Sequence, residues 1–277
     1  MLHQYLKPSE PLNHYIINYL IIHLKFDNGF IPPPKPYPVC PEQVIFFYIK
    51  GNVKISQHGK IITSIPKICI GGQQTERHDK IISSEFLMIQ VLFHPGALNK
   101  LFGISMLEFL GNYIDAEGVL GNEMKSLNEI LQNSPSYSDM ITIIETYFLK
   151  KIQKVKSGTR AVDFAGRIIL ENPQNFTLET LSKQSYLSTK QFERIFLNQL
   201  GVTPKFFARI CRFYKAFELK EKNPSTDWLS IAWDCGYTDY QHLSKDFKQF
   251  SGQTPNSLIL ENSLSPERLL GIKNMVK

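Results

Sequence analysis

A short sequence pattern occurs twice near the carboxyl-terminal end and constrains the fold more than any other feature. The first copy runs from Arg194 to Pro204 and the second from Lys245 to Pro255. A basic residue, a phenylalanine, a glycine and a Thr-Pro pair recur at matched positions, and each pair is 51 residues apart, as in 255 − 204 = 51. A constant offset predicts two copies of one supersecondary unit.

Each copy has the signals of a helix, a turn and a second helix. In the first copy, we expect Thr177 to cap a helix over 178–184, and Ser188 to cap a second helix that ends at Gly201. The second copy repeats this order with a helix over 228–235. Its expected caps, turn and helix end are Thr226 or Asp227, Gly236, Thr238 or Asp239, and Gly252.

A long helix is expected to join the two units. Thr203 and Pro204 have the residue types of an N-cap and a first helical position, and no helix breaker follows before about Glu221. At 1.5 Å per residue this helix would be roughly 25 Å long. The second helices of the two units could then be separated by about one turn of DNA, which is about 34 Å.

The amino-terminal half has the residue patterns of strands, and the chain as a whole is expected to be an α+β protein. Short β-branched and aromatic runs predict strands of a small antiparallel domain at 44–49, 53–56, 61–65 and 86–93. The proline-rich stretch 30–38 is expected to be an extended loop or a sheet edge. Helical patterns follow at 97–102, 124–131 and 137–152.

These patterns predict a division of the chain into four parts. Residues 1–150 would form a β-rich domain with trailing helices, and residues 151–160 would be a basic, glycine-broken linker. Residues 161–260 would form an all-helical domain. Residues 261–277 are expected to be a polar tail.

Each second helix has an apolar face for a core and a polar face opposite. Four aromatic residues of the helical domain, Tyr214, Phe217, Trp228 and Trp233, are also expected in the core. A helix of this kind can enter the major groove of DNA, where polar side chains near its N-terminus reach base edges and flanking groups hold phosphates. The candidate DNA-binding residues are Ser188, Lys190, Glu193, Arg194, Tyr240, Gln241, Ser244 and Lys245.

The region from about Phe176 to Ile259 resembles the DNA-binding region of the AraC/XylS family of bacterial transcription regulators. The resemblance rests on the stretches 187–196 and 201–204, on 231–237, and on Phe247 with 252–255. It implies two helix-turn-helix subdomains bridged by one long helix, with the candidate residues facing bases or backbone. Ser182 and Tyr186 depart from the pattern, since alanine and glycine are frequent there.

The amino-terminal part is similar to a β-rich, cupin-like sensor domain that precedes this module in some relatives. The similarity rests on the stretches 91–98 and 101–104. It implies binding of an effector or dimerisation, and it carries over no ligand and no contact residue.

Several other classes of site lack support in the sequence. His58, His78 and His94 are isolated from one another, so no metal site or other cofactor is expected. No nucleophile motif or phosphate-binding loop is present, so we expect no enzymatic activity. The cysteines, Cys40, Cys69, Cys211 and Cys235, have no paired spacing and are expected to be reduced core residues.

The expected partner is double-stranded DNA. RNA polymerase, a small-molecule effector and a second copy of the chain stay open as further partners. No apolar run approaches the length of a membrane span, so we expect no membrane contact and a cytoplasmic location.

Two classes of function remain at this point. The chain could be a ligand-responsive transcription regulator. Alternatively, it could be a constitutive DNA-binding protein whose first domain is a protein-interaction module without a small-molecule ligand.

Overall fold

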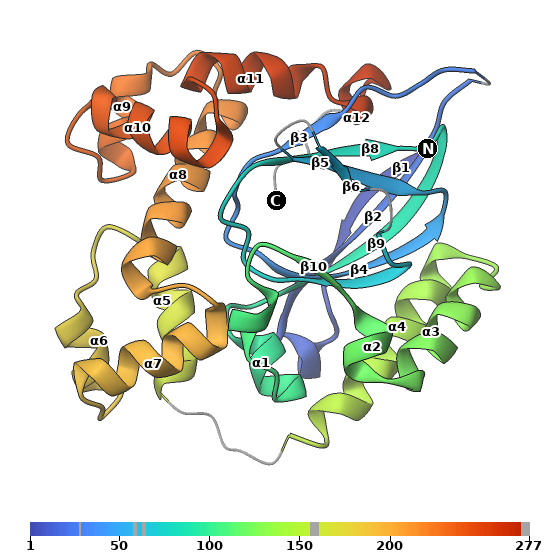
Figure 1. Ribbon diagram of the computed structural model, residues 1–277, viewed down its shortest axis with the longest axis horizontal. Coiled ribbons are helices and arrows are strands. Elements are labelled where there is room, and N and C mark those ends of the chain that lie inside the picture. Colours follow the sequence, from blue (N-terminus) through green and yellow to red (C-terminus); the bar gives the residue numbers. More distant parts are fainter. Residues whose placement is uncertain (28, 58–59, 63–64, 156–160, 273–277) are drawn as a thin grey trace.

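The computed structural model describes residues 1–27, 29–57, 60–62, 65–155 and 161–272. Its first half contains two antiparallel sheets that face each other, and its second half is helical (Figure 1). The predicted α+β class, with a β-rich first part and a helical second part, is confirmed. Among the described residues, no helix combines the length and apolar character needed to cross a bilayer.

The larger sheet has six strands and the smaller sheet has four. In spatial order, the larger sheet consists of β1 (Leu2–Leu6), β2 (Ile16–Lys25), β9 (Glu85–Phe93), β4 (Gln43–Lys50), β7 (Ile68–Gly71) and β10 (Tyr113–Asp115). The smaller sheet consists of β3 (Lys35–Tyr37), β8 (His78–Ile82), β5 (Val53–Gln57) and β6 (Lys60–Ile62). The expectation for the proline-rich stretch is confirmed, because β3 is an edge strand and Pro36 lacks the N–H that a central strand needs.

The larger sheet is buried on both faces. Alternate residues of β4 point to opposite sides, so Ile45 and Phe47 pack in one core while Phe46 and Tyr48 pack in another. The second core lies between the two sheets. The first lies under the helices α1 (Ala97–Phe102), α2 (Ala116–Leu120), α3 (Asn122–Gln132) and α4 (Tyr137–Ile152) and the short turns η1 (Glu10–Leu12) and η2 (Met106–Phe109).

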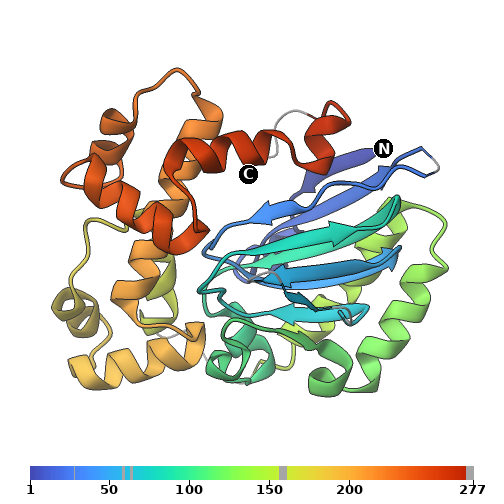
Figure 2. The ribbon, with the colours of Figure 1, turned by 45° about the horizontal axis from the view of Figure 1, so that its top comes forward.

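The helical half begins with η3 (Ala161–Phe164) and α5 (Ala165–Glu171). The first unit of the repeat is α6 (Leu178–Gln184) and α7 (Thr189–Leu200), and the second is α9 (Trp228–Asp234) and α10 (Tyr240–Ser251). Between them runs α8 (Pro204–Lys222), and α11 (Pro255–Ser263) and α12 (Pro266–Leu269) follow (Figure 2).

Each unit of the repeat has its own core, and α8 contributes to both. Phe207 of α8 packs with Phe192 and Phe196 of the first unit, while Phe213 packs with Phe247 of the second. The bridging helix is therefore part of both cores and not an exposed spacer. All four cysteines are free and buried, as expected.

The exact limits of the predicted parts stay predictions. Residues 156–160 of the expected linker and 273–277 of the expected tail lie outside the described residues. Within the described part of the tail, Glu267 of α12 is buried and pairs with Lys35 of β3.

Candidate nucleic-acid interface

Both α7 and α10 begin at a side-chain cap and end at a glycine in the left-handed region. The Ser188 hydroxyl accepts from the Gln191 backbone N–H at 3.3 Å, and Gln191 Oε1 accepts from the Ser188 N–H at 3.1 Å. In the second unit Asp239 caps α10, accepting from the His242 N–H at 2.7 Å. The reciprocal bonds between Ser188 and Gln191 satisfy N–H groups that have no partner within the first turn of a helix. This explains why α7 begins where it does.

The α9 helix is capped by Asp227 in the same way. Its carboxylate accepts from the Ser230 hydroxyl at 2.6 Å and from two backbone N–H groups. The Ser230 hydrogen bond, together with the backbone bonds, holds the pKa of Asp227 below its usual value. Of the alternatives in the sequence, Asp227 and Asp239 are therefore the caps.

The turn between the two helices differs between the units. From α6 to α9 the offset is 50 residues (228 − 178), whereas from α7 to α10 it is 51 (240 − 189), so the second turn is one residue longer. Gly236 has a φ of 76° in its turn, and Tyr186 adopts a φ of 56° at the matching position. The first turn thus keeps the left-handed conformation at Tyr186, although this conformation is unfavourable for a tyrosine.

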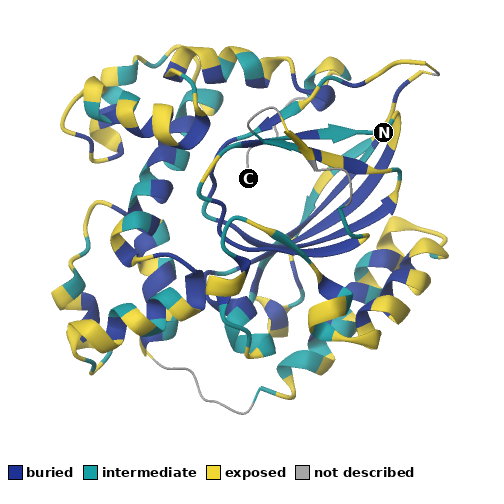
Figure 3. Cartoon of the chain, in the orientation of Figure 1, coloured by how far each residue is buried: buried dark blue, intermediate teal, exposed yellow. Residues whose placement is uncertain are grey.

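The candidate residues lie on the amino-terminal halves of α7 and α10, and most are exposed (Figure 3). The exposed ones are Ser188, Lys190, Arg194, Tyr240, Gln241 and Lys245. Glu193 and Ser244 are half-buried. The Ser188 hydroxyl already serves as the helix cap. Their contact with DNA stays a prediction.

Three cations of this surface have no anionic partner in the described part of the chain. Among the described residues, Lys190, Arg194 and Lys245 take part in no ion pair. Other cations of the helical half are used internally, since Arg209 pairs with Asp246 and Arg268 with Glu221. The unpaired charges therefore lie on the same helix faces as the polar candidates, where a polyanion can reach them.

The second helix is oriented from its buried side by Asp246. This carboxylate is 1% exposed, accepts from Arg209 Nη2 of α8 at 2.6 Å, and accepts from the Tyr237 hydroxyl at 3.1 Å. Burial, and then the charge of Asp246, raises the pKa of Tyr237, so this hydroxyl remains a donor. Sequence patterning missed Asp246, because a charged residue is expected on the solvent face of an amphipathic helix.

The expectation that Trp233 lies in the core is wrong. Its side chain is 60% exposed, and Leu229, one turn earlier on α9, is 40% exposed. The inward positions of α9 are instead taken by Ile231, Ala232 and the following Cys235. Tyr214, Phe217 and Trp228 do pack against the core of the second unit, as expected.

A cavity of about 100 Å³ lies between the β-rich domain and α8. From the β-rich domain it is lined by Tyr5, Lys35 and Tyr37, and from α8 by Tyr214 and Glu218, among others. Burial raises the pKa of Glu218. The described residues contain no cluster of three or more His, Cys, Asp or Glu side chains that could hold a metal ion.

Two family models match the chain. Residues 181–259 match a helix-turn-helix domain, and residues 4–115 match a domain of unknown function, DUF6597. The first match covers most of both units of the repeat and the helix between them.

The proteins that are similar to this chain include two curated proteins and several solved structures. The Msm operon regulatory protein of Streptococcus mutans is 22% identical over 67% of this chain and 64% of its own length. An uncharacterized HTH-type transcriptional regulator of Haemophilus influenzae is 33% identical over 41% of this chain and 37% of its own. The chain thus spans less than two thirds of either relative.

The solved structures are more distant in sequence. ToxT from Vibrio cholerae is 12% identical with a TM-score of 0.49, covering 88% of this chain and 98% of that one. The carboxyl-terminal domain of AraT, a response regulator from Geobacillus stearothermophilus, is 23% identical with a TM-score of 0.34, covering 43% and 89%.

Proposed function

We propose that this chain, whose carboxyl-terminal domain is a helix-turn-helix domain of the AraC type, is a sequence-specific DNA-binding transcription regulator. In this proposal α7 and α10 are the reading helices, each placed in the major groove, and they contact two successive segments of one duplex. We name them the first and second reading helix below.

One observation carries the proposal. Two capped helices at equivalent positions of a repeat present polar and cationic side chains at their amino-terminal halves, and a single helix holds both. The 19 residues of α8 correspond to about 28 Å at 1.5 Å per residue. With the offsets of the reading helices added, their amino-terminal ends could approach the roughly 34 Å between successive major-groove segments on one DNA face.

The side chains differ in what they can recognise. Arg194 has the fork that suits guanine O6 and N7, and Gln241 suits adenine N6 and N7. Lys190 and Lys245 can contact phosphates or guanine, while Glu193 can accept from cytosine N4. Tyr240 and Ser244 complete the surface of the second reading helix, and Ser188, as the N-cap, would place the first turn of the first reading helix beside the duplex.

The first domain would then control the second. An effector bound to the β-rich domain, or a second copy of the chain contacting it, would change how well both reading helices engage DNA. RNA polymerase would be a partner at the promoters that the protein controls. A protein with this role would act in the cytoplasm, and the proposal assigns it no catalytic step.

Selection from random duplex DNA by the full-length protein tests this function. At near-physiological salt, we expect an enriched motif with two conserved blocks about one helical turn apart. Binding that depends on salt but enriches no sequence would contradict sequence-specific reading. Metabolite-dependent affinity for the selected duplex would separate a ligand-responsive regulator from a constitutive DNA-binding protein.

A further inference from the structure

The β-rich domain contacts the last turn of both reading helices at equivalent positions of the repeat. Gln199 and Phe250 are each the second-last residue of their helix, and they are 51 residues apart (250 − 199). The Gln199 carbonyl accepts from Gln43 Nε2 at 2.8 Å, and the Phe250 carbonyl accepts from the Val39 N–H at 3.1 Å. The last four carbonyls of a helix lack donors within the helix, so each of these contacts supplies a donor to a carbonyl that would otherwise lack one.

Both donors come from one short piece of chain, residues 39–43, which we name the bridging segment. It is fixed within the β-rich domain. The Cys40 carbonyl accepts from Gln73 Nε2 at 2.8 Å, and Gln43 Oε1 accepts from the Gly96 N–H at 2.9 Å. Gln43 is also the first residue of β4 in the centre of the larger sheet. The segment therefore moves with the sheet.

The side chain of Val39 extends this contact into the helical domain. It is fully buried and belongs to the core of the second unit, together with Phe213, Phe247 and Phe250. A residue of the first domain thus completes the hydrophobic core that supports the second reading helix. Gln43 is 3% exposed, so neither contact competes with bulk water.

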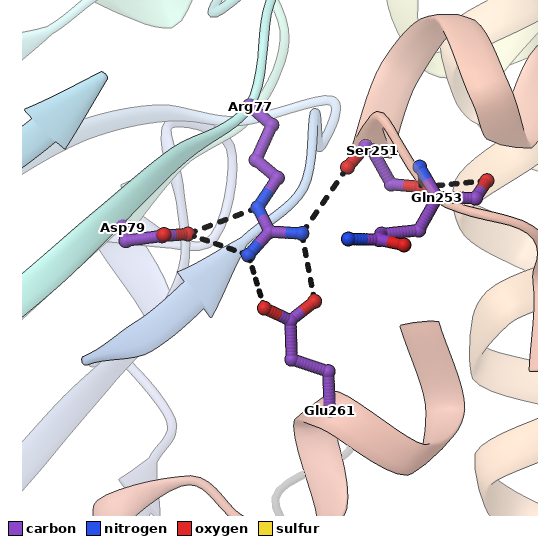
Figure 4. A network of polar contacts seen from close by, with 5 residues as sticks. All are labelled: Arg77, Asp79, Ser251, Gln253 and Glu261. Atoms are coloured by element: carbon purple, nitrogen blue, oxygen red, sulfur yellow. Dashed lines mark hydrogen bonds and ion pairs between the residues drawn. The ribbon is translucent and has the colours of Figure 1, made fainter. Parts of the chain in front are cut away.

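A second contact reinforces the one at the second reading helix (Figure 4). Arg77, just before β8, donates to the Ser251 carbonyl at 3.3 Å and pairs with both oxygens of Glu261 of α11 at 2.5 and 2.7 Å. Asp79 orients the guanidinium by accepting from Nε at 2.9 Å. A planar, two-point pair of this kind fixes direction as well as distance.

We propose that the bridging segment sets the spacing and angle between the two reading helices. This inference rests on the proposed function and adds the means of control. The α8 helix joins the two units, and a single helix can bend. The last turns of α7 and α10 both lie next to α8, since α8 begins at Pro204, just after α7, and Phe250 packs on Phe206 and Phe213 of α8. The bridging segment holds both of these turns to the sheet and so adds a second connection between the two units.

The same segment lines the cavity between the domains. Cys40 and Glu42 contribute to its wall, next to Tyr37 and Pro38. A molecule lodged there would contact the segment that joins both reading helices. It would act on DNA binding by changing their separation, without touching either helix.

A distance measurement without DNA tests the bridge directly. All four native cysteines are buried, so spin labels can be placed selectively on cysteines introduced at Lys190 and Gln241, which are exposed, equivalent positions of the two reading helices. We expect a narrow distance distribution in the otherwise unchanged chain. Val39→Ala and Gln43→Ala should each broaden or shift it.

The matched control is Val53→Ala. Val53 is 5% exposed, but it packs in the core between the two sheets and not in the core of either unit of the repeat. It should lower stability without changing the distance distribution. Distributions that stay unchanged in folded Val39→Ala and in folded Gln43→Ala would overturn the inference.

A binding measurement then connects the bridge to function. Using a selected duplex, base pairs are inserted one at a time between its two conserved blocks. We expect parent affinity to fall about tenfold or more when one block is misplaced, a loss typical of mismatched contacts. Val39→Ala should lose less, because its second reading helix is freer, whereas Val53→Ala should follow the parent.

The two experiments distinguish an error about the bridging segment from an error about DNA reading. Equal spacing profiles for the parent and both bridge variants would overturn the inference while leaving DNA reading intact. If the parent enriches no sequence at all, the proposed function fails, and the spin-label distances still decide whether the bridge holds the helices.

Discussion

Arg209 of α8 and Asp246 of α10 form the ion pair that ties the second reading helix to the bridging helix. The carboxylate is almost fully buried, whereas the Arg209 side chain is 36% exposed. The first unit has no counterpart, because Ile195 occupies the position 51 residues before Asp246. Core contacts hold both reading helices to α8, and the second has this buried charge in addition.

Arg209→Ala should lower the free energy of unfolding by about 2 kcal/mol. It leaves Asp246 with the Tyr237 hydroxyl alone, and breaking a buried pair costs about 3–5 kcal/mol, which the exposure of Arg209 reduces. Urea unfolding followed by circular dichroism measures the change. Lys205→Ala, at an exposed position of the same helix, is the control and should cost under about 0.5 kcal/mol. Equal stabilities for the two variants would show that the pair contributes nothing.

Tyr186→Gly should stabilise the protein. The tyrosine is 94% exposed and has a φ of 56°, so its left-handed backbone costs energy that no burial of its side chain offsets. We expect a gain of about 1 kcal/mol in thermal or urea unfolding, reduced somewhat by the greater freedom of glycine when unfolded.

Ser185→Gly is the control for that substitution. Ser185 has a φ of −89°, which any residue adopts, so glycine there should only cost about 0.5 kcal/mol. If both glycine variants lower stability, the backbone at Tyr186 is not strained.

Lys80 of β8 predicts how stability depends on pH. Its amine lies 3.9 Å from the ring centre of Tyr37 and 4.1 Å from that of Phe46, and the residue is 7% exposed. No carboxylate among the described residues pairs with it. Burial lowers the pKa of Lys80 to about 7. An unfolded lysine titrates near about 10.4.

Between about pH 7 and pH 10 the unfolded chain therefore holds the proton that the folded chain has lost, and stability should rise with pH. Below about pH 7 both states are protonated and the penalty of burial is constant. Lys80→Met should raise the free energy of unfolding at pH 7 by roughly 2 kcal/mol and flatten its rise above pH 7. Lys54→Met, at an exposed position of β5, should keep the rise.

The sequence predicted local structure well where caps and breakers mark it. Ser188 and Gly201 bound α7 at the residues expected, because hydrogen bonds to a cap and a left-handed glycine are local chemistry. The expected run 44–49 lies within β4. Strand β2 was not among the predicted strands, although Ile16–Lys25 pairs with both β1 and β9.

Contacts between the domains could not be predicted in this way. Val39 and Phe250 are 211 residues apart (250 − 39), and neither hydrophobic period nor turn chemistry relates them. A valine after a proline-rich stretch predicts an edge or loop, and only the folded chain places it in the core of the second unit. The exposure of Trp233 was missed for a related reason, since an aromatic residue in a helical pattern is usually inward.

Arg194→Ala is the substitution that most directly tests the first reading helix. If Arg194 contacts a guanine edge, its loss should weaken binding to the selected duplex by about 1–3 kcal/mol and relax the preference at one or two base pairs. If Lys190 holds a phosphate, Lys190→Ala should weaken binding to all sequences alike. It should also reduce the slope of log affinity against log salt concentration by about 1. Binding titrations at several salt concentrations and repeated selection measure both effects.

Lys125→Ala separates these effects from a change in net charge. Lys125 is exposed on α3 of the β-rich domain, so its removal lowers the positive charge by the same amount, away from α7 and α10. Salt screens charges that lie more than about 10 Å from the duplex, so this variant should bind like the parent. If Arg194→Ala binds and selects DNA as Lys125→Ala does, α7 does not read bases. In that case sequence preference would have to come from α10 alone.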